Sequence, residues 1–194
     1  MDRLWAPWRG QYIRDAPKAE MGLAVEDCFL CRAIAAPSTF DRENLVVCRR
    51  PNSVVMLNRF PYNNGHLLVA PLVHLGRLDE LSGAHLVEPL ETIKEMVAVL
   101  DRIFLPHGYN IGANLGKAAG AGLPGHLHWH VVPRWDGDTN FMPVLGQAKV
   151  IVESLYEFHD RFVAALAADQ SGPNPSSASA DTRVRSIADI TIEP

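Results

Sequence analysis

The chain has 194 residues, of which 47% are hydrophobic and 21% charged, and these values are ordinary for one globular domain with a buried core. The net charge is −4, no basic stripe suits nucleic acid, and no run of about 18 apolar residues predicts a membrane span. The first residues do not form a signal peptide, and the odd count of 3 cysteines argues against a disulfide framework. We therefore expect a cytoplasmic protein without a nucleic-acid or membrane partner.

The composition divides the chain into three parts. Residues 1–26 begin with an aromatic, proline-interrupted stretch, and we expect them to form an arm that packs on another surface. Residues 27–168 carry the periodic apolar segments and form the predicted domain. Residues 169–194 contain a Ser-, Pro-, Ala- and Asn-rich stretch too polar to pack, and this composition predicts a flexible tail.

The elements of the domain begin with a helical turn over 27–34, opened by Asp27 as its N-cap. Five strands and two main helices follow, in the order strand, strand, strand, helix, strand, strand, helix, and His107-Gly108 is expected to stop the first helix. This order predicts an α+β domain with a mostly antiparallel five-stranded sheet. The predicted strands cover 45–49, 53–57, 66–71, 109–114 and 127–132, and the predicted helices cover 78–104 and 149–168.

Three histidines, His126, His128 and His130, alternate with apolar residues near the end of the domain. In an extended strand they share one face, while Leu127 and Trp129 belong to the core. Each imidazole needs a hydrogen-bond partner and can act as nucleophile, base, acid or metal ligand near neutral pH. The alternative is a His-rich surface strand or an accidental metal-binding tract.

Two other features indicate chemistry only in combination with this strand. The Gly- and Ala-rich loop 116–125 leads into it and is a plausible phosphate cradle beside three histidines, although most such loops are turns. Cys28 and Cys31 have the spacing of zinc ligands, but a redox pair or two buried cysteines fit the spacing as well. His66 and His74, taken singly, are most simply structural.

Together these residues resemble the histidine triad (HIT) family of nucleotide hydrolases and transferases. The resemblance spans residues 27–168 and rests on the three alternating histidines, on Asn64-Gly65-His66 followed by Val69 and Pro71, and on Pro133-Arg134. Segments 4–9, 114–116 and 134–141 are similar to the bacterial and mycobacterial branch described as diadenosine tetraphosphate phosphorylases. The resemblance implies a HIT-like fold and a homodimer.

The resemblance also implies roles for individual residues. His128 would attack the α-phosphorus of an adenine nucleotide and form a nucleotidyl-histidine intermediate, and His130 would stabilise charge on a phosphate oxygen. Asn58 matches a ribose-binding position and His66 a supporting histidine. The loop residues expected to bind substrate are Asn114, Gly116, Gly120, Ala121 and Gly122.

A structural zinc is implied by the zinc-containing members of the family and their relatives. Carried over to this chain, the ligands are Cys28, Cys31, His74 and His126. Four protein ligands leave no open coordination position, so the ion would support the fold rather than the reaction.

One position departs from the pattern of the hydrolase branches. They carry Gln four residues before the first histidine, where this chain has Gly122. We therefore expect cleavage of diadenosine tetraphosphate to ADP and ATP with inorganic phosphate as acceptor. The alternatives are a hydrolase of dinucleoside polyphosphates or nucleoside phosphoramidates, and a zinc-stabilised nucleotide-binding module without turnover.

Overall fold

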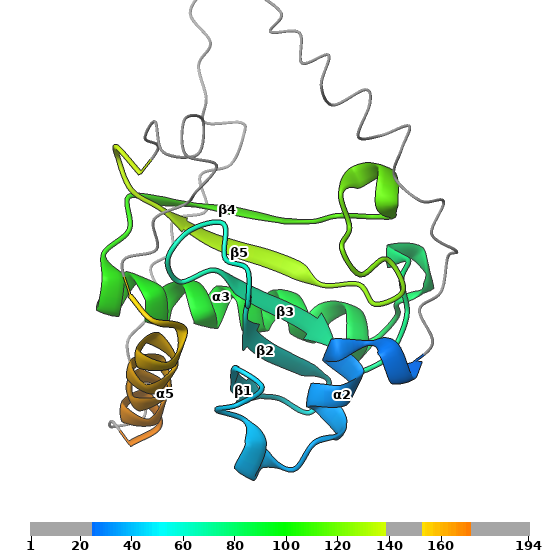
Figure 1. The fold of residues 1–194 in the computed structure, drawn as a ribbon, viewed down its shortest axis with the longest axis horizontal. Coiled ribbons are helices and arrows are strands. Elements are labelled where there is room, and N and C mark those ends of the chain that lie inside the picture. The colour runs from blue at the N-terminus through cyan, green and yellow to red at the C-terminus, as the bar shows by residue number, and fades with distance from the viewer. Residues whose placement is uncertain (1–24, 139–152, 172–194) are drawn as a thin grey trace, which may run out of the picture.

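The computed structural model describes residues 25–138 and 153–171, which form one antiparallel sheet packed against helices (Figure 1). The sheet has five strands in the order β1-β2-β3-β5-β4, and every neighbouring pair is antiparallel. The predicted α+β class and antiparallel sheet are therefore confirmed. Residues 1–24 of the expected arm 1–26, the segment 139–152, and residues 172–194 of the expected tail 169–194 lie outside the described residues.

The strands lie where the sequence predicts them, with small shifts at their ends. They are β1 (Val46–Arg49), β2 (Ser53–Leu57), β3 (Leu67–Pro71), β4 (Gly108–Ala113) and β5 (Trp129–Arg134). The first strand begins one residue later than predicted because Leu45 has a φ of 61°, in the left-handed region, which breaks regular extended structure.

The α-helices within the described residues are α2 (Phe29–Ala35), α3 (Ala84–Phe104) and α5 (Leu155–Ser171). The prediction that Asp27 caps α2 is wrong, because the Cys28 side chain accepts the Cys31 amide in that place. Helix α3 ends at Phe104 as predicted, but its C-cap is Leu105, whose φ is 46°, and not His107-Gly108. Helix α5 starts at Leu155 rather than at 149, and Ser154 Oγ accepts the Glu157 amide there.

The helix predicted over 78–104 is divided in the structure. Leu78–Glu80 form a separate 3-10 turn, and Gly83, with a φ of 54°, precedes α3. Further 3-10 turns occupy Val25–Asp27, Ser38–Phe40 and Lys117–Ala119. Among the described residues no helix is long and apolar enough to cross a membrane.

Two apolar clusters cover the two faces of the sheet. One joins the sheet to α3 and α5 through residues such as Met96, Leu100, Phe158 and Phe162. The other packs α2 against β1, β2 and β3, with Leu30 and Ala33 among its members. Figure 1 shows α3 behind the strands, so the opposite face of β3, β5 and β4 remains for a site.

The sides of the histidine segment separate as the alternating pattern predicts. Leu127, Trp129 and Val131 belong to the core cluster with α3. Strand β5 itself begins only at Trp129, so His126 and His128 lie in the segment that leads into the strand. The three imidazoles therefore have separate backbone surroundings, although they come from alternate positions.

Candidate functional site

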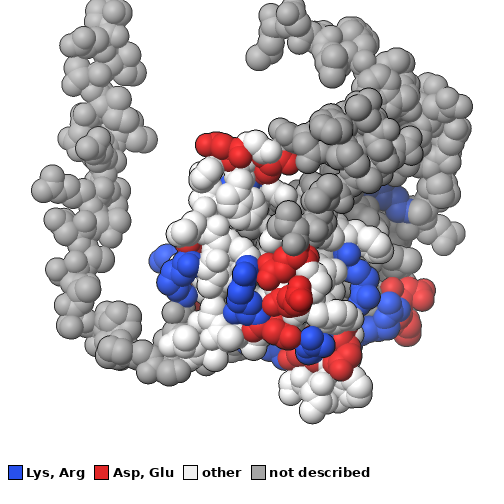
Figure 2. Space-filling view, turned by 60° about the vertical axis from the view of Figure 1, so that its left-hand side comes forward, with Lys and Arg blue, Asp and Glu red and all other residues white. Residues whose placement is uncertain are grey.

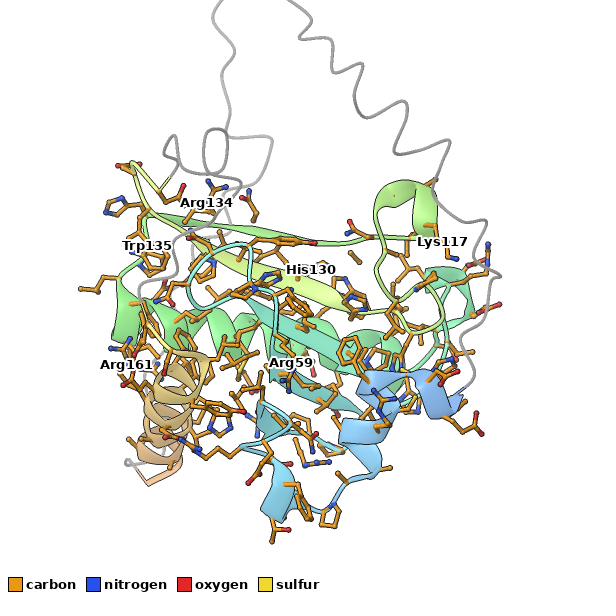
Figure 3. The ribbon with its side chains drawn as sticks, in the orientation of Figure 1. Arg59, Lys117, His130, Arg134, Trp135 and Arg161 are labelled. Atoms are coloured by element: carbon orange, nitrogen blue, oxygen red, sulfur yellow. The ribbon has the colours of Figure 1, made fainter. Side chains whose placement is uncertain are left out.

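His130 projects from the middle of the sheet, on the face opposite α3 (Figure 3). Leu68 of β3 pairs with it on one side and Gly112 of β4 on the other, and directly paired residues share a face. A Cβ added at Gly112 would meet no atom within 4 Å. The strand next to His130 therefore leaves open space on the same face.

His128 is held by a backbone carbonyl. Its Nδ1 lies 2.8 Å from the carbonyl oxygen of His126, and a carbonyl only accepts hydrogen bonds. The proton therefore sits on Nδ1, and Nε2 carries the lone pair. The residue is 8% exposed, and burial lowers the pKa of its ring below the ordinary value. His128 is thus a neutral imidazole whose Nε2 can act as a nucleophile.

His66 fixes the tautomer of His130, and the result is opposite to that of His128, because His130 accepts a hydrogen bond at Nδ1. The Tyr62 amide donates to His66 Nδ1 at 3.0 Å, and Asn58 Nδ2 lies 3.2 Å from the same atom. Both groups are donors, because Asn58 Oδ1 accepts the Phe60 amide. The proton of His66 therefore lies on Nε2 and is donated to His130 Nδ1 across 2.9 Å.

His130 consequently carries its own proton on Nε2, where it is a hydrogen-bond donor. The Tyr62 ring stacks on the His130 ring, with centroids 5.5 Å apart and an interplanar angle of 22°. Burial, and secondarily His128, lower the pKa of His130 to about 4. The neighbouring rings thus present one lone pair and one N–H donor, which suits attack on phosphorus beside a stabilised phosphate oxygen.

The Gly-rich loop before the triad is a closed turn. The amides of Gly120 and Ala121 donate to Lys117 O and Gly116 O, and Asn114 Nδ2 reaches Gly120 O at 3.5 Å. Gly116 and Gly120 have φ values of 75° and 88°, which explains glycine at both positions. Contact of this loop with phosphate, and of Asn58 with ribose, stays a prediction. Gly122 is exposed, with nothing within 4 Å of an added Cβ.

A second cluster joins the four residues predicted as zinc ligands. One side-chain donor atom from each of Cys28, Cys31, His74 and His126 lies within 4.8 Å of every other. His126 Nδ1 is 3.4 Å from both sulfur atoms, and His74 Nδ1 is 3.2 Å from Cys31 Sγ. Tetrahedral zinc with ordinary bond lengths requires sulfur–nitrogen separations of about 3.6 Å, so the donor set fits the ion.

The protonation of these residues also suits a metal. His126 Nε2 donates to Pro71 O at 2.9 Å, which leaves the lone pair on Nδ1, toward the sulfur atoms. Burial lowers the pKa of His126 to about 4, so the ring is neutral. Burial and Cys28 raise the pKa of the Cys31 thiol to about 11, and a bound cation would reverse this by favouring the thiolate.

Backbone contacts bring the distant ligands together. Leu127 N donates to Leu75 O at 2.7 Å, so the segments containing His74 and His126 run side by side. A Cβ at Gly76 would lie 2.3 Å from Pro124 O, and only glycine allows that approach. On the other side, Arg49 donates to three carbonyls at the end of α2 and so holds the Cys-bearing segment on β1.

Several contributors to the site could not be found from sequence reasoning. Tyr62 and Asn63 fall in a segment that predicts only a turn, and the carbonyls of Pro71 and His126 act through backbone atoms that no motif reveals. Asp138 belongs to the segment that resembles the phosphorylase branch, but the resemblance implies no role for it. The one sequence feature that could have suggested a role for Tyr62 is its position between the end of a predicted strand and His66.

Comparisons with known proteins agree with this geometry. The HIT domain family matches residues 40–137. The chain is 38% identical to "AP-4-A phosphorylase" of Mycobacterium tuberculosis, over 80% of this chain and 79% of that protein. It is 31% identical to "Bis(5'-nucleosyl)-tetraphosphatase [asymmetrical]" of Schizosaccharomyces pombe, over 52% of this chain and 55% of that protein.

A solved structure with the same fold contains zinc. The "ZN-bound histidine triad family protein" of Mycobacterium smegmatis is 25% identical, with a TM-score of 0.61 over 76% of this chain and 99% of that one. Two paired histidines with fixed protons, a Cys/His metal cluster and these similarities lead to one assignment. The chain belongs to the HIT domain family.

Proposed function

We propose that the protein cleaves diadenosine tetraphosphate through a nucleotidyl-His128 intermediate and transfers the nucleotide to inorganic phosphate. The observation that carries the proposal is the pair of fixed tautomers, with a lone pair on His128 Nε2 and an N–H on His130 Nε2. The names of the two enzyme relatives support the class of substrate.

In the first step His128 Nε2 attacks the α-phosphorus, the phosphorus–nitrogen bond forms, and ATP leaves with the electrons of the broken phosphorus–oxygen bond. The ring retains its Nδ1 proton and becomes cationic, and the His126 carbonyl oxygen 2.8 Å away stabilises that charge. The His130 N–H donates to a non-bridging oxygen of the same phosphorus.

In the second step an oxygen of inorganic phosphate attacks the same phosphorus. The phosphorus–nitrogen bond breaks, its electrons return to His128 Nε2, and ADP is released. The sum is diadenosine tetraphosphate plus phosphate giving ADP plus ATP. Covalent catalysis of this kind replaces one difficult displacement with two easier ones.

The choice of phosphate over water is supported by Gly122 and by the phosphorylase relative. Gly122 offers no side chain to hold water, and the space beside it is open. Hydrolysis to AMP and ATP is the second candidate, favoured by the similarity to the yeast tetraphosphatase. A nucleotide-binding module without turnover is the third, and it would yield no product.

Product analysis with and without phosphate separates these three functions. We expect phosphate to accelerate cleavage and ADP to appear with ATP. Gly122→Gln should shift the products toward AMP, because the amide crowds phosphate and offers water a hydrogen bond. Ala118→Gln, at another exposed position of the loop, is the size-matched control and should keep the wild-type ratio. Only AMP and ATP at saturating phosphate would establish the hydrolase instead.

We further propose that zinc is the metal and that its role is structural. Cys28, Cys31, His74 and His126 would supply four ligands, so no position remains for substrate. The ion would hold the segment 126–128 against α2 and β3. Thiolate ligands require a reducing surrounding, which agrees with the expected cytoplasmic location.

A homodimer is proposed through the edge strand β4. Edge strands of monomers are usually protected from pairing by charged residues or proline. Strand β4 has neither over Gly108–Ala113, and its Ile111 is 48% exposed. Pairing two β4 strands would cover the edge. Ile111→Lys should convert the dimer to a monomer by light scattering, and a wild-type monomer at micromolar concentration would refute the proposal.

A further inference from the structure

The loop between β2 and β3, residues 58–66, delivers the Tyr62 amide to His66 and so sets the protons of the catalytic pair. If loop 58–66 were displaced, His66 Nδ1 would lose both of its donors, the Tyr62 amide and Asn58 Nδ2, and His66 would no longer be restricted to one tautomer. His130 would then spend part of its time with the proton on Nδ1. The position of the loop therefore controls whether His130 can donate to phosphate.

The residue next to Tyr62 ties the loop to the end of β5. Asn63 Nδ2 donates to Pro133 O at 3.1 Å and to Asp138 Oδ2 at 2.7 Å. Gly65 fits equally closely, since an added Cβ would lie 3.1 Å from the Phe158 ring and 3.3 Å from Pro133. The loop is thus pressed against the strand that carries His130.

Asp138 is the junction of this attachment. Its carboxylate accepts Arg134 Nε at 2.6 Å and Nη2 at 2.7 Å, and Trp135 N at 3.2 Å. Arg134 continues to Asn110 Oδ1 on β4 at 2.7 Å. These bonds, the Arg134 pair above all, hold the pKa of Asp138 well below its usual range, so the carboxylate stays charged.

An ion pair between Arg134 and Asp138 alone would act only within the end of β5, and water screens it because Arg134 is 40% exposed. Asn63, a further partner of Asp138, connects this ion pair to loop 58–66. Asp138 is only 11% exposed, and its Oδ2 reaches outside the β5 turn to the loop that holds His66. Figure 3 shows Arg134 at the end of β5, away from His130.

We propose that Asp138, through Asn63, is a positioning residue that keeps loop 58–66 in place and thereby holds His66 and His130 in the productive tautomers. The inference rests on the proposed reaction for its kinetic consequence. The chain of contacts runs from Asp138 to Asn63, Tyr62, His66 and His130.

The direct test is the tautomeric state of the histidine rings, measured by nitrogen-15 NMR on the full chain. In the wild type, His66 and His130 should carry protons on Nε2. In Asp138→Asn both should show mixed tautomers, and kcat should fall by about 10–100-fold, a typical loss for a misplaced catalytic group, with little change in KM. Asn63→Ala removes only the loop's side of the contact and should give the same signature.

Asp160→Asn is the matched control, because it also breaks a bidentate Asp–Arg pair, with Arg42, but does not touch the loop. Its ring tautomers and kcat should match the wild type. Unchanged tautomers in folded Asn63→Ala, with kcat within two-fold of this control, would overturn the proposal. The NMR result does not depend on turnover, so failure of the proposed reaction would leave the tautomer test intact.

Discussion

At one end of the segment 126–130, His126 is fully buried and turns its lone pair toward two sulfur atoms and His74. At the other end, His130 is partly exposed and turns an N–H toward the open face of the sheet. His128 lies between them with its lone pair on Nε2. Identical residues four positions apart therefore belong to the predicted zinc site and to the proposed phosphate site.

The three imidazoles are chemically identical, and they differ in which nitrogen is protonated because each ring has a different hydrogen-bond partner. His126 donates to the carbonyl of Pro71, His128 to the carbonyl of His126, and His130 accepts from His66. The bonded nitrogen of each ring fixes what the other nitrogen offers. That nitrogen carries a lone pair on Nδ1 of His126, a lone pair on Nε2 of His128 and a proton on Nε2 of His130. The two sites also share a bond, because the carbonyl that orients His128 belongs to the predicted zinc ligand His126.

The sharpest way to separate the two ends is His128→Ala. We expect turnover to fall by more than about 10⁴-fold, beyond the usual loss of a general acid or base, because no covalent intermediate can form. The fold and nucleotide binding should remain, as measured by circular dichroism and calorimetric titration. Activity within ten-fold of the wild type would contradict the role of this residue.

The metal end should respond in the opposite way. Cys31→Ser or removal of zinc by a chelator should lower the melting temperature by about 10 °C, since several kcal/mol are lost at about 2–4 °C per kcal/mol. The turnover rate of the molecules that remain folded should change little, because the zinc is proposed to support the fold and not the reaction. Cys48→Ser, at a cysteine outside the cluster, is the control. Freshly purified, reduced protein without zinc in metal analysis would refute the assignment.

The smallest effect is expected from the pH response of His130. Its ring has a pKa near 4 in the folded chain and about 6.5 when unfolded, so the unfolded chain binds the extra proton between these values. Its contribution to stability is therefore present above about pH 6.5 and is lost as the pH falls toward 4. The free energy of unfolding, measured by urea titrations, should depend less on pH in His130→Gln than in the wild type, and an equal pH slope in the two proteins would contradict this prediction.

The strands could be predicted from the sequence, because apolar periodicity depends on residue type, and the four residues predicted as zinc ligands come together in one cluster. Alternating apolar residues place Leu127, Trp129 and Val131 in the core, and the resemblance to zinc-containing relatives selects His74 and His126 as partners of the two cysteines. The ends of the elements are less predictable. Leu45 and Leu105 have left-handed backbone conformations, which a leucine in the sequence does not indicate.

The hydrogen-bond partners of the triad could not be predicted in the same way. His126 and His128 donate to the carbonyls of Pro71 and His126, and His66, the partner of His130, accepts the amide of Tyr62. These are backbone groups that nearly every residue type possesses. Only the fold brings them to the rings. The Asp138–Asn63 contact likewise joins residues 75 positions apart, and no spacing within the chain indicates it.

The proposed reaction requires that His128 becomes covalently attached to a nucleotide during turnover. The direct measurement is rapid mixing with diadenosine tetraphosphate without phosphate, quenching in base, and tandem mass spectrometry of the His128 peptide. We predict an adenylyl group on His128 that disappears, with release of ADP, when phosphate is added before the quench. Product formation at an undiminished rate without any adenylyl-His128 during turnover, or with the group on another residue, would contradict the account.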